Sequence, residues 1–265
     1  MTMHYTISRR KFTTQLIASP ALIGAAQLVG PFSTRARAQS NTLVTINVRS
    51  QSPSPQNFFF FQQPAIYTGG EDVYSNSLYN GSLPAFGSGQ GAQLTFLNSL
   101  QYFAGVQTSN TSAPPVGQVS GYNSAWVATG LQASGMSNPC STKFTQSNGT
   151  QLSLSLPVVD PAVQLGAFRV AIPTFNPNTY NFNVGSATLN EMTGSVVLSN
   201  FVLANPTTFQ DCQPVLIYYV QTGAYTPGTV MNFSQSSQSA AVCDATNGKY
   251  NFNVTYKADG TWAVI

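Results

Sequence analysis

Residues 56–63 read QNFFFFQQ, and the four consecutive phenylalanines in this stretch constrain the fold. Successive side chains of a β-strand point to opposite faces, so Phe58 and Phe60 share one face while Phe59 and Phe61 share the other. A single core buries only one of these pairs. The second pair, left in water, would expose about 300–500 Å² of apolar surface. We therefore expect a layered β structure in which both pairs are covered.

Strand patterns continue along the rest of the chain. In TLVTINVRS, residues 42–50, Val44, Ile46 and Val48 alternate with polar residues. Similar segments rich in β-branched and aromatic residues are TQLSLSLP, AFRVAIP, YNFNVG, PVLIYYVQ and KYNFNVTY, separated by Pro, Gly, Asn and Ser. The pattern predicts an all-β fold, namely an antiparallel β-sandwich of about ten strands, the class that includes the jelly roll.

Two segments carry more specific expectations. NFNVTY and TWAVI flank a turn at residues 257–260 that contains an Asp-Gly step, which predicts a hairpin at the C-terminal end. SATLNEMTGSVV, residues 186–197, is the one helix-like window, although it is short, rich in Thr and interrupted by Gly194.

The first 38 residues have the features of an export signal. A basic SRRKFT at residues 8–13 precedes an apolar run, and Ala36 and Ala38 frame an A-x-A cleavage site. The apolar run is too short and too interrupted by Pro and Gly to be a stable membrane span. We expect residues 1–38 to be cleaved and residues 39–265 to form a single β-sandwich domain with no membrane span.

The leader has a more specific resemblance. Arg9 and Arg10 follow Ser8, and Phe12 stands two residues further on. This arrangement resembles a bacterial twin-arginine (Tat) signal, although Thr13 stands where that pattern often has Leu. The resemblance implies that the translocase reads the arginine pair and exports the folded protein to the periplasm or the exterior. An ordinary Sec signal is the alternative.

Removal of the leader changes the charge of the chain. The mature part has 265 − 38 = 227 residues, with five basic and seven acidic side chains, so its net charge is 5 − 7 = −2. No basic cluster remains to neutralise phosphates, which argues against nucleic acid as a partner.

The only histidine, His4, lies in the leader. Its loss excludes Ser-His-Asp and Cys-His catalysis, histidine-ligated zinc or copper, and histidine ligation of haem. The chain also lacks a C-x-x-C pair and a D-x-D-x-D-G calcium loop. We therefore expect no cofactor and no transition metal.

Three cysteines remain after cleavage: Cys140, Cys212 and Cys243. An oxidising destination permits one internal disulfide, and the cost of loop closure weakly favours Cys212 with Cys243. Three buried free thiols are the alternative.

Three kinds of cover are available for Phe59 and Phe61: a loop, a second subunit or a ligand. The segment of residues 69–91 carries aromatic side chains and is the expected cover. Strands rich in Asn, Gln, Ser and Thr, with few Lys, lack the usual protection against edge pairing, which favours self-assembly. Trp126 either packs in the core or stacks on a bound sugar. Phe59, Phe61 and Trp126 together form the candidate binding surface.

With histidine absent, carboxylates are the remaining candidate catalytic groups. Glycoside cleavage requires two of them several ångströms apart and no histidine. The mature chain offers Glu71, Asp72, Asp160, Glu191, Asp211, Asp244 and Asp259, without a motif. We expect an exported, non-catalytic β-sandwich protein of the cell envelope or exterior that acts through surface binding or assembly. The alternative is a histidine-free carbohydrate-active enzyme that uses two of these acids.

Replacement of both Arg9 and Arg10 by lysine should leave the precursor in the cytoplasm with its leader attached, because the Tat receptor reads the arginine pair in the resembling family. Lysine keeps the charge, so the loss would report recognition of arginine itself. Cell fractionation followed by immunoblotting measures the outcome. Normal export of the double variant would contradict the Tat assignment.

Overall fold

β-Strands dominate the computed structural model, which describes residues 42–69, 72–89, 91–147 and 151–265. These residues hold twenty strands and one helix of five residues, and they belong to one compact unit, residues 40–265. The predicted all-β sandwich class is confirmed, with about twice the expected number of strands. The predicted export signal lies outside the described residues, including Arg9, Arg10, Phe12, Ala36 and Ala38.

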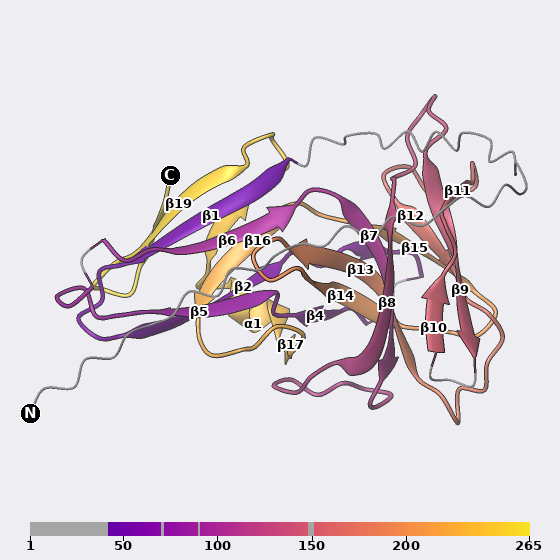
Figure 1. Cartoon of the computed structure of the whole chain (residues 1–265), viewed down its shortest axis with the longest axis horizontal. Helices are drawn as coiled ribbons and strands as arrows, with labels where there is room; N and C mark the ends of the chain where they lie inside the picture. Colours follow the sequence, from indigo (N-terminus) through magenta and orange to yellow (C-terminus); the bar gives the residue numbers. More distant parts are fainter. Residues whose placement is uncertain (1–41, 70–71, 90, 148–150) are drawn as a thin grey trace, which may run out of the picture. The chain divides into compact units, whose positions relative to one another are not determined.

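The largest sheet has ten strands (Figure 1). Its main path runs in spatial order through β17 (Val230–Met231), β4 (Tyr74–Asn76), β14 (Ser195–Leu203), β13 (Phe182–Asn190), β6 (Leu94–Ser99), β1 (Leu43–Ser50), β19 (Asn251–Tyr256) and β20 (Trp262–Val264). From β13 a branch leads through β7 (Tyr102–Ser109) to β8 (Gly121–Thr129).

Two smaller sheets complete the layers. The four-stranded sheet has the order β18 (Ala241–Asp244), β16 (Ile217–Thr222), β2 (Gln56–Gln62) and β5 (Tyr79–Leu83). The six-stranded sheet has the order β10 (Gln151–Leu154), β9 (Pro139–Ser147), β12 (Phe168–Ala171), β15 (Phe209–Gln213) and β3 (Ile66–Tyr67), with β11 (Val158–Val159) also on β9. Most pairs are antiparallel, as expected, but β1 pairs with β19 and β12 with β9 in parallel.

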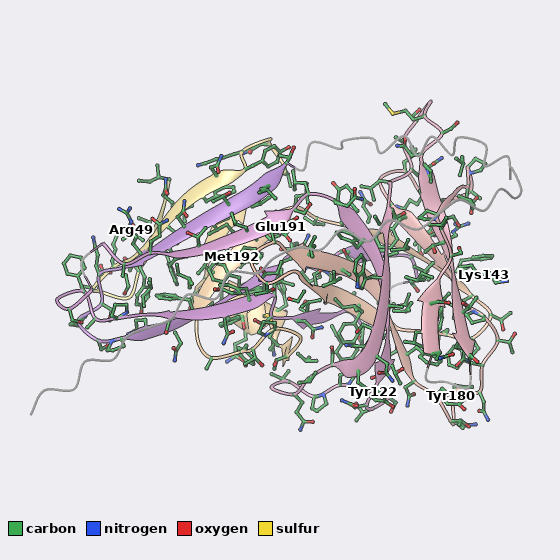
Figure 2. The ribbon with its side chains drawn as sticks, in the orientation of Figure 1. Arg49, Tyr122, Lys143, Tyr180, Glu191 and Met192 are labelled. Carbon is green, nitrogen blue, oxygen red and sulfur yellow. The ribbon has the colours of Figure 1, made fainter. Side chains whose placement is uncertain are left out.

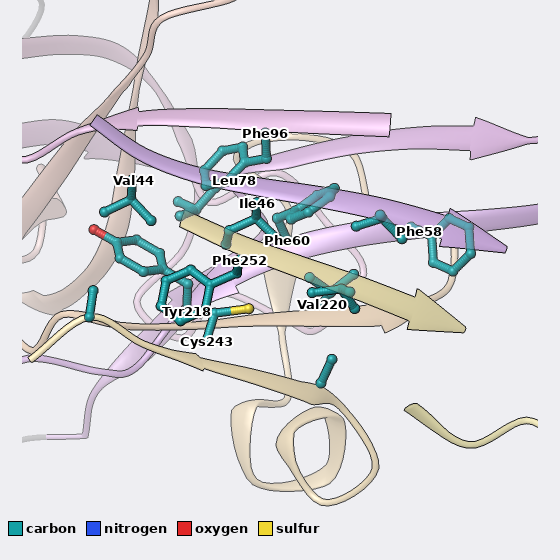
Figure 3. Packing of buried hydrophobic residues seen from close by; sticks show 14 of the residues in the cluster. Val44, Ile46, Phe58, Phe60, Leu78, Phe96, Tyr218, Val220, Cys243 and Phe252 are labelled. Atoms are coloured by element: carbon teal, nitrogen blue, oxygen red, sulfur yellow. The ribbon is translucent and has the colours of Figure 1, made fainter. Parts of the chain in front are cut away.

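The first core lies between the four-stranded sheet and one part of the ten-stranded sheet (Figure 3). The predicted alternation is confirmed here, because Val44, Ile46 and Val48 of β1 are fully buried. From the opposite layer, Phe58 and Phe60 enter the same cluster. The Phe60 ring stacks on Phe96 with ring centroids 5.0 Å apart.

The second core lies between the six-stranded sheet and strands β7, β13 and β14 of the ten-stranded sheet. Phe144 and Phe182 meet there edge to face, with centroids 5.1 Å apart. The two layers are also joined by a buried hydrogen bond, in which the Tyr67 hydroxyl of β3 donates to the Asn200 carbonyl of β14 at 2.8 Å. Each part of the long sheet thus buries its face against a different partner sheet.

Phe59 and Phe61 are buried on the outer side of the four-stranded sheet, so the expectation that both phenylalanine pairs are covered is confirmed. The cover comes from residues 223–240, not from residues 69–91. Tyr225 lies 4.9 Å from the Phe59 ring, and Phe233 of helix α1 (Phe233–Ser237) lies 5.9 Å from the Phe61 ring.

The segment of residues 69–91 does supply an aromatic ring, but to the other side of the sheet. Tyr79 of β5 packs on Phe60, with centroids 5.7 Å apart, and so belongs to the first core. Strand β5 pairs directly with β2, and a neighbour within the sheet cannot also form a layer over it.

The C-terminal hairpin is confirmed. Strands β19 and β20 pair in antiparallel order, and Gly260 has a φ of 82°, the left-handed conformation that the turn requires. The helix-like window of residues 186–197 forms the β13–β14 hairpin instead, in which Asn190 pairs with Ser195 across the turn. A Thr-rich segment interrupted by Gly194 has little helix propensity, and pairing with the neighbouring strands decides its structure.

The predicted disulfide between Cys212 and Cys243 is not formed. All three cysteines are free and buried, and each belongs to a different hydrophobic cluster. Cys212 lies in the second core and Cys243 in the first, so their nearness in sequence does not bring the sulfur atoms together. Burial raises the pKa of the Cys243 thiol to about 12 and also raises the pKa of Cys212.

Phe59→Ala and Phe61→Ala should each lower the free energy of unfolding by about 3–5 kcal/mol, because each removes a ring from a packed cluster. Phe86, which is 46% exposed, offers a matched control, and Phe86→Ala should change stability by no more than about 0.5 kcal/mol. Urea unfolding followed by circular dichroism measures the three variants. Changes in the free energy of unfolding as small as that of Phe86→Ala at positions 59 and 61 would contradict the cover by residues 223–240.

The mature protein should show no rapidly reacting thiol at neutral pH and three after unfolding, because burial keeps the reagent from all three and disfavours the thiolates of Cys212 and Cys243. Since the folded-state pKa of Cys243 is raised, its contribution to stability is complete below about pH 9 and is lost as the pH rises towards about 12. Thiol titration with and without denaturant tests the first statement. The second statement is tested by measuring the free energy of unfolding between pH 9 and 12. This free energy should fall less steeply with rising pH in Cys243→Ala than in the parent.

Candidate functional site: the edge of β8 and the groove beside it

The structure separates the three residues of the predicted binding surface. Phe59 and Phe61 are 1% and 0% exposed, so they offer nothing to a ligand, because residues 223–240 cover them. Trp126 of β8 is 50% exposed. Its ring meets Phe103 edge to face at 5.5 Å, and it stands opposite Gly105 in the neighbouring strand. The surface around Trp126 is therefore the part of the prediction that remains available.

Strand β8 is paired on one side only. Its neighbour is β7, and no ladder to another described strand is present on its second side. Ala125 and Val127 point to the second core, while Trp126 and Ala128 are exposed. Strand β10 lies against β8 and contributes Leu152 to the same core, so side chains rather than backbone hydrogen bonds join the two.

The length of β8 distinguishes it from the other edge strands that the structure describes. Unprotected edges present a row of free backbone donors and acceptors, and proteins commonly keep such strands short. Strand β8 has nine residues, whereas the next longest edge strand, β5, has five. The remaining edges have two to four residues: β3, β10, β11, β17, β18 and β20.

Charge does not protect this edge either. Residues 73–142, which include β7 and β8, contain no Asp, Glu, Lys, Arg or His. By contrast, the short edge strand β18 ends at Asp244, and the turn before β20 carries Lys257 and Asp259. Lysine and inward-pointing charges are the usual means of preventing edge-to-edge pairing, and β8 has neither.

A β-bulge lies near the start of β8. The register shifts between Gln107 and Thr108 of β7, and Asn123 is the extra residue on β8, with a left-handed φ of 49°. Asparagine tolerates this conformation better than most residues. Beyond the bulge, the Gln107 amide donates to the Ser124 hydroxyl at 3.1 Å, and the register with β7 is regular to Thr129.

Buried amides anchor this end of β8. The Gln107 Oε1 atom accepts from the Ser120 hydroxyl at 2.8 Å and from the Asn183 amide at 3.2 Å. The Asn76 amide of β4 donates to the same Ser120 hydroxyl at 3.1 Å. These bonds connect β4, β7 and β13 to the residue that precedes β8, so they fix the position where the strand begins.

A groove of about 720 Å³ lies between β8 and the β9–β10 hairpin. Apart from one leucine, its lining consists of uncharged polar side chains: Asn123, Ser124, Thr145, Gln146, Ser147, Gln151, Leu152 and Ser153. The Gln146 Oε1 atom is buried and has no hydrogen-bond partner among the described residues. Figure 2 shows Tyr122, which is 50% exposed, at the same end of β8.

Two of the described acids, Asp160 and Asp211, share one arginine. Arg169 of β12 binds Asp211 through two hydrogen bonds, of 2.6 and 2.9 Å, and reaches Asp160 at 3.4 Å. The hydrogen bond to Asp211 raises the pKa of Arg169, which keeps the guanidinium charged between the two carboxylates. Asp160 and Asp211 are thus both bound to one guanidinium.

The remaining acids have local roles or lie apart. Asp244 and Asp259 accept hydrogen bonds from Thr246 and Thr261 in their own turns, and these bonds lower both carboxyl pKa values. Glu191 lies in the turn between β13 and β14, and Asp72 is exposed before β4. Glu71 lies outside the described residues.

Metal ligands are not gathered in the part of the chain that the structure describes. Within it, no group of three or more His, Cys, Asp or Glu side chains is placed to hold a metal ion. No helix among the described residues is long and apolar enough to cross a membrane.

The edge of β8 was missed from sequence because it is a property of strand order. GYNSAWVAT has the same alternation and polar composition as strands that lie inside a sheet. Only its length and the absence of charge around it were available as signals.

Comparisons with protein-family models, curated proteins and solved structures found no match.

Proposed function

We propose that residues 39–265 form an exported, non-catalytic protein of the cell envelope or exterior that acts by assembling with copies of itself through the edge of β8. The observation that carries the proposal is the nine-residue length of this uncharged, one-sided strand. Addition of a strand to a sheet edge satisfies the free backbone groups of both partners.

A second copy of the chain suits this edge. In a two-fold arrangement, β8 of one copy runs antiparallel to β8 of the other, and each residue near the axis faces its own copy or a close neighbour. Any charge on such a strand would therefore meet a like charge. Strand β8 has none, so symmetric pairing carries no electrostatic penalty.

The regular part of β8 limits where pairing takes place. From Ser124 to Thr129 the strand follows β7 without a register shift, whereas the bulge at Asn123 disrupts the strand before it. Pairing over this regular part brings the exposed Trp126 rings of two copies near the shared surface. Aromatic cross-strand contacts add to the stability of such a pair.

The leader supports the cellular part of the proposal. Its basic, apolar and small-residue regions are those of an export signal, and its arginine pair resembles a Tat signal. A protein that acts by assembly outside the cytoplasm needs no catalytic group. This agrees with the absence of histidine after residue 4.

Ala128→Lys tests the proposal, because it places a charge on an exposed position of β8 without removing a core side chain. The mature protein should sediment as a dimer or larger species at micromolar concentration, whereas Ala128→Lys should sediment as a monomer. Ala258→Lys makes the same substitution in the exposed β19–β20 turn and should assemble like the parent. Sedimentation velocity measures all three proteins.

Two results would refute the assignment. One is a parent protein that remains monomeric throughout the concentration range. The other is an Ala128→Lys variant that assembles as well as the parent. A melting temperature close to that of the parent would show that the variant has kept its fold.

A further inference from the structure

We infer that the groove between β8 and the β9–β10 hairpin is a binding site for a neutral carbohydrate. This inference is distinct from self-assembly, because the lining shares only Ser124 with the regular part of the edge and otherwise lies in the bulge of β8 and in the facing hairpin.

The chemistry of the lining selects the class of ligand. Hydroxyl and amide groups both donate and accept hydrogen bonds, which matches the many hydroxyl groups of a sugar. The described lining residues include no ionisable side chain, so they offer nothing to balance a phosphate, a sulfate or an ammonium group. Lys143 of β9 is the nearest basic residue along that strand and is not part of the lining.

Gln146 is the most specific feature of the lining. Its Oε1 atom is buried within the lining and accepts no hydrogen bond from the described residues. Buried carbonyl oxygens without a donor are uncommon, because the loss of hydration is not compensated. Because this atom has almost no accessible surface, a ligand hydroxyl supplies the missing donor when the Gln146 side chain turns towards the groove.

The opposite wall is held in a defined position. Ser124 accepts a hydrogen bond from Gln107, so its own hydroxyl hydrogen is free to donate to a ligand. The bulge places Asn123 beside it, and the buried amides behind Gln107 hold this part of β8 in place. Preorganised polar groups lose little conformational entropy when a ligand binds.

The volume of the groove also fits a saccharide. Sites for small molecules occupy about 300–1,000 Å³, and the groove, at about 720 Å³, lies within that range. Tyr122 precedes Asn123 at the same end of β8 and keeps half of its surface exposed, but it is not part of the lining.

Affinity electrophoresis under native conditions tests the site. The mature protein is run in gels that contain dextran, mannan or laminarin as neutral polymers, and in a gel that contains heparin as a sulfated one. We expect at least one neutral polymer to retard the protein and heparin to leave its mobility unchanged.

Asn123→Gly is the principal variant, because glycine adopts the left-handed conformation of this position while the amide is removed. Gln146→Leu is the second, because it replaces the unpartnered amide by a side chain of similar size. Each should weaken retardation roughly tenfold. Gln118→Leu alters an exposed glutamine outside the lining and should bind like the parent.

Retardation by a neutral polymer that is lost in Asn123→Gly and Gln146→Leu and kept in Gln118→Leu supports the site. The absence of retardation by all three neutral polymers overturns it, as does equal binding by folded Asn123→Gly. Ala128→Lys should be monomeric and still retarded, so the failure of assembly and the failure of carbohydrate binding give different results.

Discussion

The burial of both faces of β2 is the constraint on which the rest of the structure depends. Phe58 and Phe60 enter the first core, while Phe59 and Phe61 require a second apolar layer on the other side. The chain meets this requirement with residues 223–240, which return over the four-stranded sheet through a short helix. Because each ring contributes about 1.5–3 kcal/mol when buried, neither layer can be removed without a large loss of stability.

Because charged residues are scarce, uncharged polar side chains form most of the polar contacts in the rest of the structure. Arg169, Asp211 and Asp160 form the one cluster of ion pairs among the described residues, and it lies on the six-stranded sheet. Elsewhere, amides and hydroxyls take the place that charged groups usually occupy. They join strands in the buried contacts around Gln107, and they line the groove beside β8. The same composition leaves the edge of β8 without protection.

Local patterns predicted the strands, but not how distant strands meet. Val44, Ile46 and Val48 lie in the core because alternation follows directly from strand geometry. The cover of Phe59 could not be inferred in this way, because Tyr225 is more than 160 residues away in sequence, and polar amide side chains flank both phenylalanine pairs alike. The cysteine pairing failed for a related reason, since nearness in sequence does not show which core each thiol enters.

The parallel pairing of β1 with β19 has a consequence for the order of folding. Asn47 and Asn253, which are joined by a side-chain hydrogen bond between these strands, are 206 positions apart in the chain. The first described strand therefore has no partner on that side until nearly the whole polypeptide has left the ribosome. Contacts of such long range slow folding, because the entropy of closing the loop is lost before the contact forms. During synthesis, β1 must remain unaggregated for almost the full duration of translation.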